Sequence, residues 1–114
     1  MNKYRNVKTE VDGIVFASKK EADRYQELKL LERAGKICDI KLQPKFLVIP
    51  VFTSSSGVKH RATHYVADFM YEVVDGKAKN LPIVEDAKGV RTKEYIIKRK
   101  LFEHQYPDIL FREV

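Results

Sequence analysis

The sequence lacks several features that would place it in a common class of protein. It has a single cysteine, Cys38, and no tryptophan. One cysteine cannot form an internal disulfide, and a chain without disulfides is typical of a reducing compartment. No CxxC pair occurs and no histidine lies near Cys38 in the sequence, which argues against a structural zinc site. Stability therefore has to come from one modest apolar core.

Other absences narrow the function. No stretch approaches the ~20 apolar residues that a membrane span requires, and the polar N-terminus has no apolar segment typical of a secretory signal. The chain contains no P-loop, GxGxxG or GxSxG motif. We therefore expect a cytoplasmic protein without a nucleotide-binding loop or a serine-hydrolase elbow.

The charge balance is the first positive signal. The 114 residues include 22 Lys and Arg against 16 Asp and Glu, giving a net charge of +6. This length predicts one domain over residues 1–114, with a basic N-terminal arm over residues 1–12. A basic excess on a small domain favours a polyanionic partner, although a solvated basic surface is the plain alternative.

Two helices are expected from their capping signals. The first covers residues 18–34, where Ser18 and Glu21 form a capping box and Gly35 ends the helix. The second covers about 93–106, with Thr92 as N-cap and Pro107 as the stop. The residues expected to face the core are Tyr25, Leu28 and Leu31 in the first helix and Tyr95, Ile97, Leu101 and Phe102 in the second.

Extended segments occupy much of the remaining sequence. They are expected over residues 13–16, 40–52 (interrupted by two prolines), 62–74, 81–89 and 108–114. In 62–74, Tyr65, Ala67, Phe69 and Tyr71 are expected to share one face. Asp75-Gly76 predicts a hairpin joining 62–74 to 81–89. The order predicts an α/β (α+β) fold, with a mixed central sheet flanked by helices.

Three charged residues in this sheet converge. Strand periodicity places Asp86 and Lys88 on one face with Ala87 opposite, and the hairpin brings Asp68 beside them. Two neighbouring carboxylates repel each other unless a cation lies between them. Mg²⁺ or Mn²⁺ would resolve this, held by the two aspartates and the Ala87 carbonyl. A lysine beside a metal-bound water suits phosphodiester hydrolysis.

Asp68, followed after 17 residues by Asp86-Ala87-Lys88, resembles the signature of the PD-(D/E)XK nuclease superfamily. The chain is similar over most of its length to small phage and prophage proteins assigned as nucleases of this superfamily, through YVADF, VEDAKG, LQPKF and the two helical segments. The resemblance implies a restriction-endonuclease-like core, DNA as substrate and a bacterial host cell. It also implies that the first helix supplies Glu21 to the metal site.

The sequence departs from the pattern at two points. Ala67 stands where the motif name has proline, and an aspartate, Asp86, stands where glutamate is commoner. Glu85 directly precedes it, but strand parity turns Glu85 away from Lys88, so Asp86 is assigned to the motif. By the same resemblance Gln43 and Lys98 are accessory candidates. These two residues and Glu21 each also have a purely structural interpretation. Glu21 could close the helix cap, Gln43 could satisfy the ends of strands, and Lys98 could pair with Glu94.

Basic residues outside the motif form the expected DNA-contacting rim. They are Lys3, Arg5 and Lys8 in the arm, Lys59 and Arg61 at a loop tip, and Arg91, Lys93, Lys98, Arg99 and Lys100 around the second helix. The sequence thus predicts a metal-dependent DNA endonuclease that recognises the DNA backbone or a branched shape. Branched or recombination intermediates are its candidate substrates, and a homodimer is its candidate assembly. The alternatives are a catalytically inactive nucleic-acid-binding module of the same fold, and a protein-interaction part of a phage replication or packaging complex.

Overall fold

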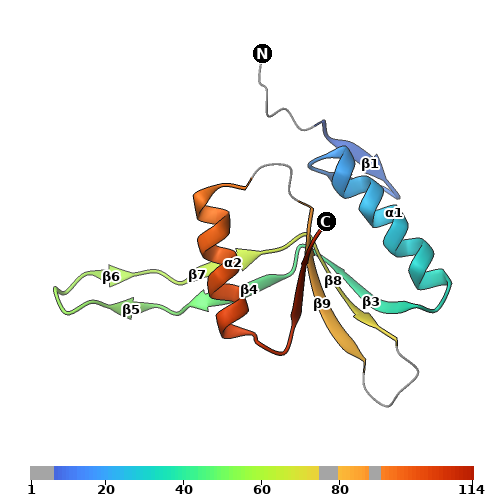
Figure 1. Cartoon of the computed structure of the whole chain (residues 1–114). Helices are drawn as coiled ribbons and strands as arrows, with labels where there is room; N and C mark the ends of the chain where they lie inside the picture. The colour runs from blue at the N-terminus through green and yellow to red at the C-terminus, as the bar shows by residue number, and fades with distance from the viewer. Residues whose placement is uncertain (1–6, 75–79, 88–90) are drawn as a thin grey trace.

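A four-stranded mixed sheet forms the centre of the molecule (Figure 1). The structure is a computed structural model that describes residues 7–74, 80–87 and 91–114. The strand order is β10-β9-β8-β3; β10 runs parallel to β9 and the other pairs are antiparallel. The strands are β3 (Ile37–Leu42), β8 (Phe69–Val73), β9 (Leu81–Asp86) and β10 (Leu110–Glu113).

The two helices, α1 (Lys19–Arg33) and α2 (Lys93–Gln105), pack on opposite faces of this sheet. Ile83 of β9 lies in a core cluster with Ala22, Tyr25 and Leu28 of α1. The next residue, Val84, lies in a second cluster with Tyr95 and Phe102 of α2. Because alternate residues of a strand face opposite sides, β9 separates the two clusters. The predicted mixed α+β architecture with flanking helices is confirmed.

The ends of α1 follow the predicted caps, but its buried face does not. The Ser18 hydroxyl accepts the Glu21 N–H at 3.1 Å. At the other end Gly35 has φ +74°, and Lys36 N–H reaches the Leu31 carbonyl at 3.0 Å. Leu31 is exposed, contrary to the prediction. A spacing of three residues drifts about 60° around the helix at each step, so the stripe through Tyr25 and Leu28 has left the sheet by Leu31.

Helix α2 begins as predicted, with the Thr92 hydroxyl accepting the Tyr95 N–H at 3.0 Å. Tyr95 and Phe102 are buried and Leu101 packs beside them. Ile97 is 57% exposed, so its predicted place in the core is wrong. It lies two residues from Tyr95, which turns it about 200° away from the buried face of the helix.

The predicted strand over 62–74 is divided into β7 (Thr63–Val66) and β8 by Ala67 and Asp68. β8 pairs with β3, whereas β7 pairs with β4 (Lys45–Ile49). Tyr65, Ala67, Phe69 and Tyr71 are all buried, but not on one face. Tyr65 and Ala67 join the α2 cluster, and Phe69 and Tyr71 join the α1 cluster. The prediction of a single face is wrong because the chain changes sheet between Ala67 and Phe69.

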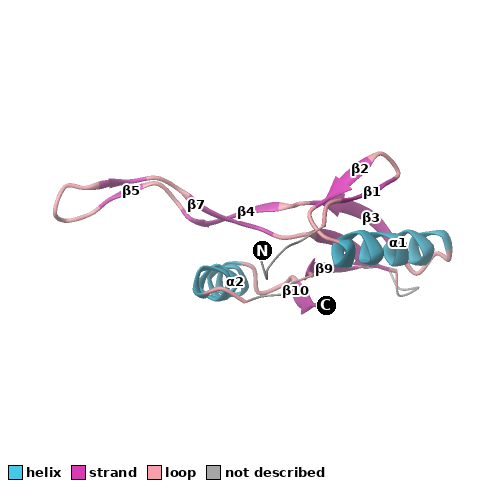
Figure 2. Cartoon of the chain, turned by 90° about the horizontal axis from the view of Figure 1, so that it is seen from above, coloured by secondary structure: helices cyan, strands magenta, loops and turns pink. Residues whose placement is uncertain are grey.

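A β-ribbon, residues 45–66, extends from this break. It consists of the β4–β7 pair and, farther out, the pair of β5 (Phe52–Thr53) and β6 (Lys59–His60). Figure 2 shows the ribbon projecting well past α2. The molecule measures 54 × 49 × 22 Å with a radius of gyration of 16.5 Å. A compact chain of this length would have a radius of about 13 Å.

Part of the predicted N-terminal arm is folded. β1 (Thr9–Val11) pairs with β2 (Ile14–Phe16) through a turn at Asp12 and Gly13. Val11 and Ile14 pack against the α1 cluster, so the arm prediction is wrong for residues 9–11. Lys3 and Arg5, the Asp75-Gly76 turn and Lys88 lie outside the described residues. Neither α1 nor α2 combines the length and apolar composition needed to cross a membrane.

Candidate active site

A small cavity brings together three residues that the sequence placed in the site. Glu21 from the first turn of α1, Gln43 from the β3–β4 junction and Asp68 from the β7–β8 junction line a volume of about 120 Å³. The rest of its wall is apolar, from the β1–β2 hairpin and the end of β3 (Ile14, Val15, Phe16 and Leu42). Residues separated by 47 positions in sequence therefore meet at the point where the ribbon leaves the sheet.

Asp68 is fixed by hydrogen bonds to three segments. Its Oδ2 accepts the Ala87 N–H at 2.7 Å. Its own N–H donates to the Glu85 carbonyl at 3.1 Å, and its carbonyl accepts the Gln43 N–H at 2.9 Å. The carboxylate is thus held over the end of β9, beside Asp86 and Ala87, as the predicted β8–β9 pairing required.

Gln43 has a backbone conformation that few residues adopt. Its φ is +49°, in the left-handed region where side chains other than glycine are uncommon. The hydrogen bond to the Asp68 carbonyl maintains this conformation. Such local strain is often found at functional sites, and here it turns the chain from β3 into the ribbon beside the cavity.

Glu21 lies both in the helix cap and in the wall of the cavity. Its backbone N–H donates to Ser18, which is the first half of the predicted capping box. Its partly buried side chain lines the cavity that contains Asp68. The helix cap therefore lies at the rim of the candidate site.

Asp86 is fully buried on the α2 side of β9. Its Oδ2 accepts a hydrogen bond from the Tyr65 hydroxyl. Burial, followed by this hydrogen bond to Asp86, raises the pKa of Tyr65 well above its ordinary value. The Asp86 carboxylate is absent from the lining of the Glu21–Gln43–Asp68 cavity. Asp68 connects the cavity with Asp86. It lines the cavity, and its carboxylate accepts the N–H of Ala87, the residue that follows Asp86.

Glu85, also fully buried, faces the α1 side as strand parity predicts. Arg24 donates to both of its carboxylate oxygens, from Nε at 2.7 Å and from Nη2 at 2.6 Å. The Tyr71 hydroxyl donates to the same carboxylate. Burial and the hydrogen bond to Glu85 raise the pKa of Tyr71 to about 12. Glu85 is thus neutralised by its own partners, and its role is structural.

Sequence reasoning missed Arg24 and Tyr65, the residues that hold the two buried acids. A signal for Arg24 exists in the sequence: it lies between Ala22 and Tyr25, on the buried side of α1, while Glu85 lies in an otherwise apolar strand. Each of these charges needs a partner of opposite sign. For Tyr65 the sequence offers only its place in the strand that precedes Asp68.

The donor set is suited to a hard divalent cation, since Glu21, Asp68, Asp86 and the Ala87 carbonyl all offer oxygen. In the conformation described, however, residues 7–74, 80–87 and 91–114 contain no group of three His, Cys, Asp or Glu side chains arranged to hold a metal ion. Asp86 is directed toward Tyr65 instead. The Tyr65 bond occupies Oδ2 of Asp86, and Oδ1 is buried as well, so an ion shared with Asp68 would have to be reached through Oδ1 or by exchange of the Tyr65 bond.

Two of the predicted DNA-binding arginines are engaged in the protein. Arg91 and Arg99 both donate to Glu113 on β10, at 2.6 and 3.0 Å, and Arg99 also lies 4.2 Å from the Phe111 ring centroid. The Tyr95 hydroxyl donates to Glu113 at 2.8 Å. These bonds, that from Tyr95 foremost, lower the pKa of Glu113. Arg99 therefore joins β10 to α2, and Arg91 joins β10 to the segment that precedes α2.

Lys98 lies outside the Asp68 cavity. It forms an ion pair with Glu94 at 2.9 Å and lines a separate cavity of about 220 Å³ with His64, Tyr65 and Tyr95. The plain alternative, a pair within the helix, is thus what the structure contains. The other predicted basic contacts that are described have exposed side chains: Lys8, Lys59, Arg61, Lys93 and Lys100.

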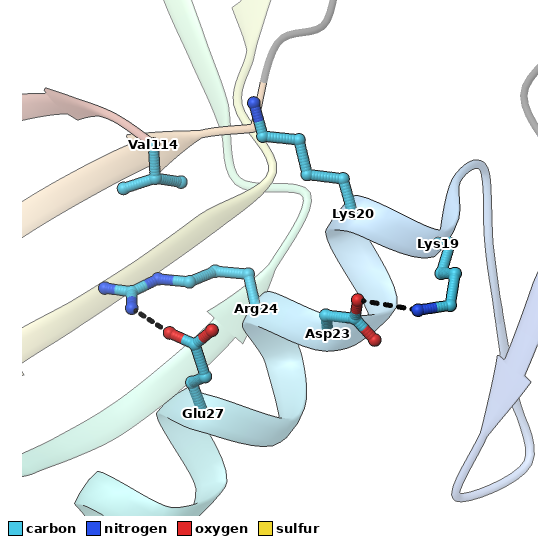
Figure 3. A pocket seen from close by; sticks show the side chains of 6 residues that line it. All are labelled: Lys19, Lys20, Asp23, Arg24, Glu27 and Val114. Atoms are coloured by element: carbon cyan, nitrogen blue, oxygen red, sulfur yellow. Dashed lines mark hydrogen bonds and ion pairs between the residues drawn. The ribbon is translucent and has the colours of Figure 1, made fainter.

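A larger cavity, of about 420 Å³, lies along α1 and contains none of the predicted site residues (Figure 3). It is lined by Lys19, Lys20, Asp23, Arg24, Glu27 and Val114. Lys19 pairs with Asp23 at 3.2 Å, and Arg24 pairs with Glu27 at 2.8 Å as well as with Glu85. Since these charges are balanced by neighbours on the same helix or on β9, this cavity is not the candidate site.

Comparison with known families gives one match. The model of a family described as "Protein of unknown function (DUF1064)" matches residues 1–113. The chain belongs to the DUF1064 family. No curated protein and no solved structure matches it. The matched residues include those of the Glu21–Gln43–Asp68 cavity, both buried acids of β9 and the ribbon. The family description assigns no activity to any of them.

Proposed function

We propose that the chain is a metal-dependent DNA endonuclease, with its site at the junction of α1, the ribbon and β9. The observation that carries the proposal is the convergence of Glu21, Gln43 and Asp68 on one cavity, with Asp68 bonded to the backbone beside Asp86. Three segments far apart in sequence supply these residues. The mixed sheet between two helices agrees with the restriction-endonuclease-like core that the motif resemblance implies.

Mg²⁺ or Mn²⁺ would be held by Asp68, Asp86 and the Ala87 carbonyl, with Glu21 completing the set. When bound, the ion would polarise a phosphoryl oxygen and activate water at neutral pH. The chain's own residues supply position: the Ala87 N–H orients the Asp68 carboxylate, and the Gln43–Asp68 bond fixes the loop that carries it. Lys88 would orient the attacking water and stabilise negative charge on the phosphate.

Purified wild-type protein should therefore nick DNA when Mg²⁺ or Mn²⁺ is added. The assay should compare linear duplex, single-stranded, flap and four-way-junction DNA, because nothing in the site specifies a base sequence. D68A and K88A should remove cleavage, and E27A, on the exposed side of α1, is the matched control. No cleavage of any of these substrates by folded wild-type protein with either metal would refute the proposal.

A second candidate function is a nucleic-acid-binding module that keeps the fold without catalysis. It is favoured by the burial of Asp86 against Tyr65, which takes one predicted ligand out of the cavity. DNA binding that is equal in EDTA and in Mg²⁺, with no product formed, would select this alternative.

Cleavage of both strands by so small a domain would require two copies, so the active form we propose is a homodimer. Its place would be the cytoplasm of a bacterial cell that carries the phage or prophage.

A further inference from the structure

The β-ribbon, residues 45–66, has a structure that the proposed active site does not explain. Its inner end is anchored: Phe46, Val48 and Tyr65 pack against α2, and the Tyr106 hydroxyl donates to the Leu47 carbonyl at 2.9 Å. Beyond Ile49 and Thr63 it leaves the core. Residues 55–61 are all exposed, and so are Val51, Phe52 and Thr53 on the opposite strand.

The outer end carries apolar side chains in solvent. Val51, Phe52 and Val58 are 67%, 45% and 51% exposed. Phe52 stacks on His60 across the β5–β6 pair, with ring centroids 4.8 Å apart and planes 20° apart. A two-stranded hairpin is marginally stable alone, so exposed aromatic and branched residues at its tip suggest that a partner covers them.

The charge of the ribbon indicates which partner. Residues 45–66 contain two lysines, one arginine and two histidines, and no aspartate or glutamate. Lys59 and Arg61 lie next to the Phe52–His60 stack and are exposed. About half of the ribbon residues are apolar, and all of its charged residues are basic. This composition is complementary to a nucleic acid, whose phosphates attract the cations and whose bases contact apolar and aromatic groups.

The geometry favours duplex DNA. The ten or so residues from Lys45 to the loop span roughly 33 Å at the usual rise of a strand. That length is close to one turn of B-DNA, about 34 Å, and the major groove, about 12 Å wide, admits a two-stranded β-ribbon. Both strands of the ribbon join the candidate site at its inner end, where the Gln43–Asp68 and Ala67–Pro44 backbone bonds lie.

We infer that the β-ribbon binds along a groove of duplex DNA, with Lys59 and Arg61 on the phosphates and Phe52 against the bases, and leads the duplex to the site at its inner end. The inference rests on the proposed function for its choice of DNA and names the surface that recognises it.

Binding of a fluorescent duplex to the full chain in EDTA tests the inference without requiring cleavage. F52A and K59A/R61A should each weaken binding roughly tenfold, and K59A/R61A should lower the slope of log affinity against log salt by roughly two. The matched controls, L30A and R33A/K36A, change exposed residues at the far end of α1 and should bind like the wild type. Thermal unfolding should be unchanged in all four variants.

The outcomes separate the two proposals. Binding lost on ribbon substitution in a protein that never cleaves would support the ribbon and refute the nuclease. Cleavage and binding unchanged in F52A and K59A/R61A would refute the ribbon and leave the nuclease standing. A wild-type dimer that these substitutions dissociate, with no duplex binding, would overturn the inference and assign the ribbon to a second copy of the chain.

Discussion

Two consecutive acidic residues at the end of β9, Glu85 and Asp86, are both fully buried but in different surroundings. On the α1 face Glu85 receives two hydrogen bonds from Arg24 and one from Tyr71. On the α2 face the Oδ2 of Asp86 accepts a hydrogen bond from the Tyr65 phenol, and Asp86 lies beside the loop that carries Asp68. The first environment pairs the carboxylate with an arginine, and the second contains the neutral hydroxyl of Tyr65.

The difference bears on which face of β9 could bind a cation. A buried carboxylate matched by a bidentate arginine gains little by binding a cation. A buried carboxylate that accepts from a phenol, with a second carboxylate bonded to the backbone of the next residue, would gain charge compensation from a divalent ion bound to both. The face of β9 that carries Asp86 is therefore the one we assign to metal chemistry.

The largest stability effect should come from Arg24→Ala. It would leave the Glu85 charge buried without its cation, which costs about 3–5 kcal/mol of unfolding free energy. Urea unfolding at pH 7 measures this loss. R24M/E85Q, which removes both charges and retains an amide for Tyr71, should recover most of it. A single variant as stable as the wild type would mean that the pair does not form.

The next largest stability effect should come from removing the Tyr65 hydroxyl, with removal of the Tyr71 hydroxyl as the comparison. Tyr65→Phe leaves the buried Asp86 without the hydroxyl that its Oδ2 accepts, at a cost of about 1–3 kcal/mol. Tyr71→Phe should cost less, about 1 kcal/mol, because Glu85 keeps both bonds from Arg24. Urea unfolding of the two variants side by side tests the order. A larger cost for Tyr71→Phe would reverse our reading of the two faces.

The smallest effect should be that of Glu113, a partly buried acid whose arginine partners, Arg91 and Arg99, are more exposed than it is. The Tyr95 hydroxyl and Arg91 lower its pKa below the ordinary value of 4.5. Its stabilisation is therefore present above that value and lost as the pH falls through the lower, folded-state pKa. E113Q should be less stable than the wild type at pH 7 by at most about 1 kcal/mol. Thermal unfolding from pH 7 down to pH 3 should show this gap closing, and a gap that widens in acid would contradict the assignment.

The sequence predicted those parts of the fold that depend on local chemistry. Ser18, Gly35 and Thr92 marked helix ends because capping is decided by neighbours in the chain. Strand parity also predicted that Glu85 and Asp86 lie on opposite faces, because successive side chains of a strand alternate whatever the tertiary contacts are. Leu31 was misplaced because burial depends on where the sheet ends, which helical periodicity alone does not reveal. Ile97 was misplaced against that periodicity, since it lies about 200° around the helix from Tyr95.

Other features depended on tertiary contacts. The break at Ala67 and Asp68 is made by backbone bonds to Pro44, Gln43 and Glu85, which no local pattern encodes. The ribbon follows from that break, and so does the cavity shared by Glu21 and Asp68. The Arg24–Glu85 pair joins residues 61 positions apart. Its only signal in the sequence is that each of the two charges lies at a position expected to be buried.

The rate of Mn²⁺-dependent DNA cleavage by two matched isosteres, D86N and E85Q, tests the division of β9 most directly. Both substitutions keep side-chain shape and remove one charge, and both proteins should be assayed at a temperature where circular dichroism shows them folded. D86N should lower the rate at least about a hundredfold through loss of a metal ligand, while E85Q should cleave like the wild type. Cleavage that survives in D86N and is lost in folded E85Q would contradict the assignment of the metal site to the Asp86 face.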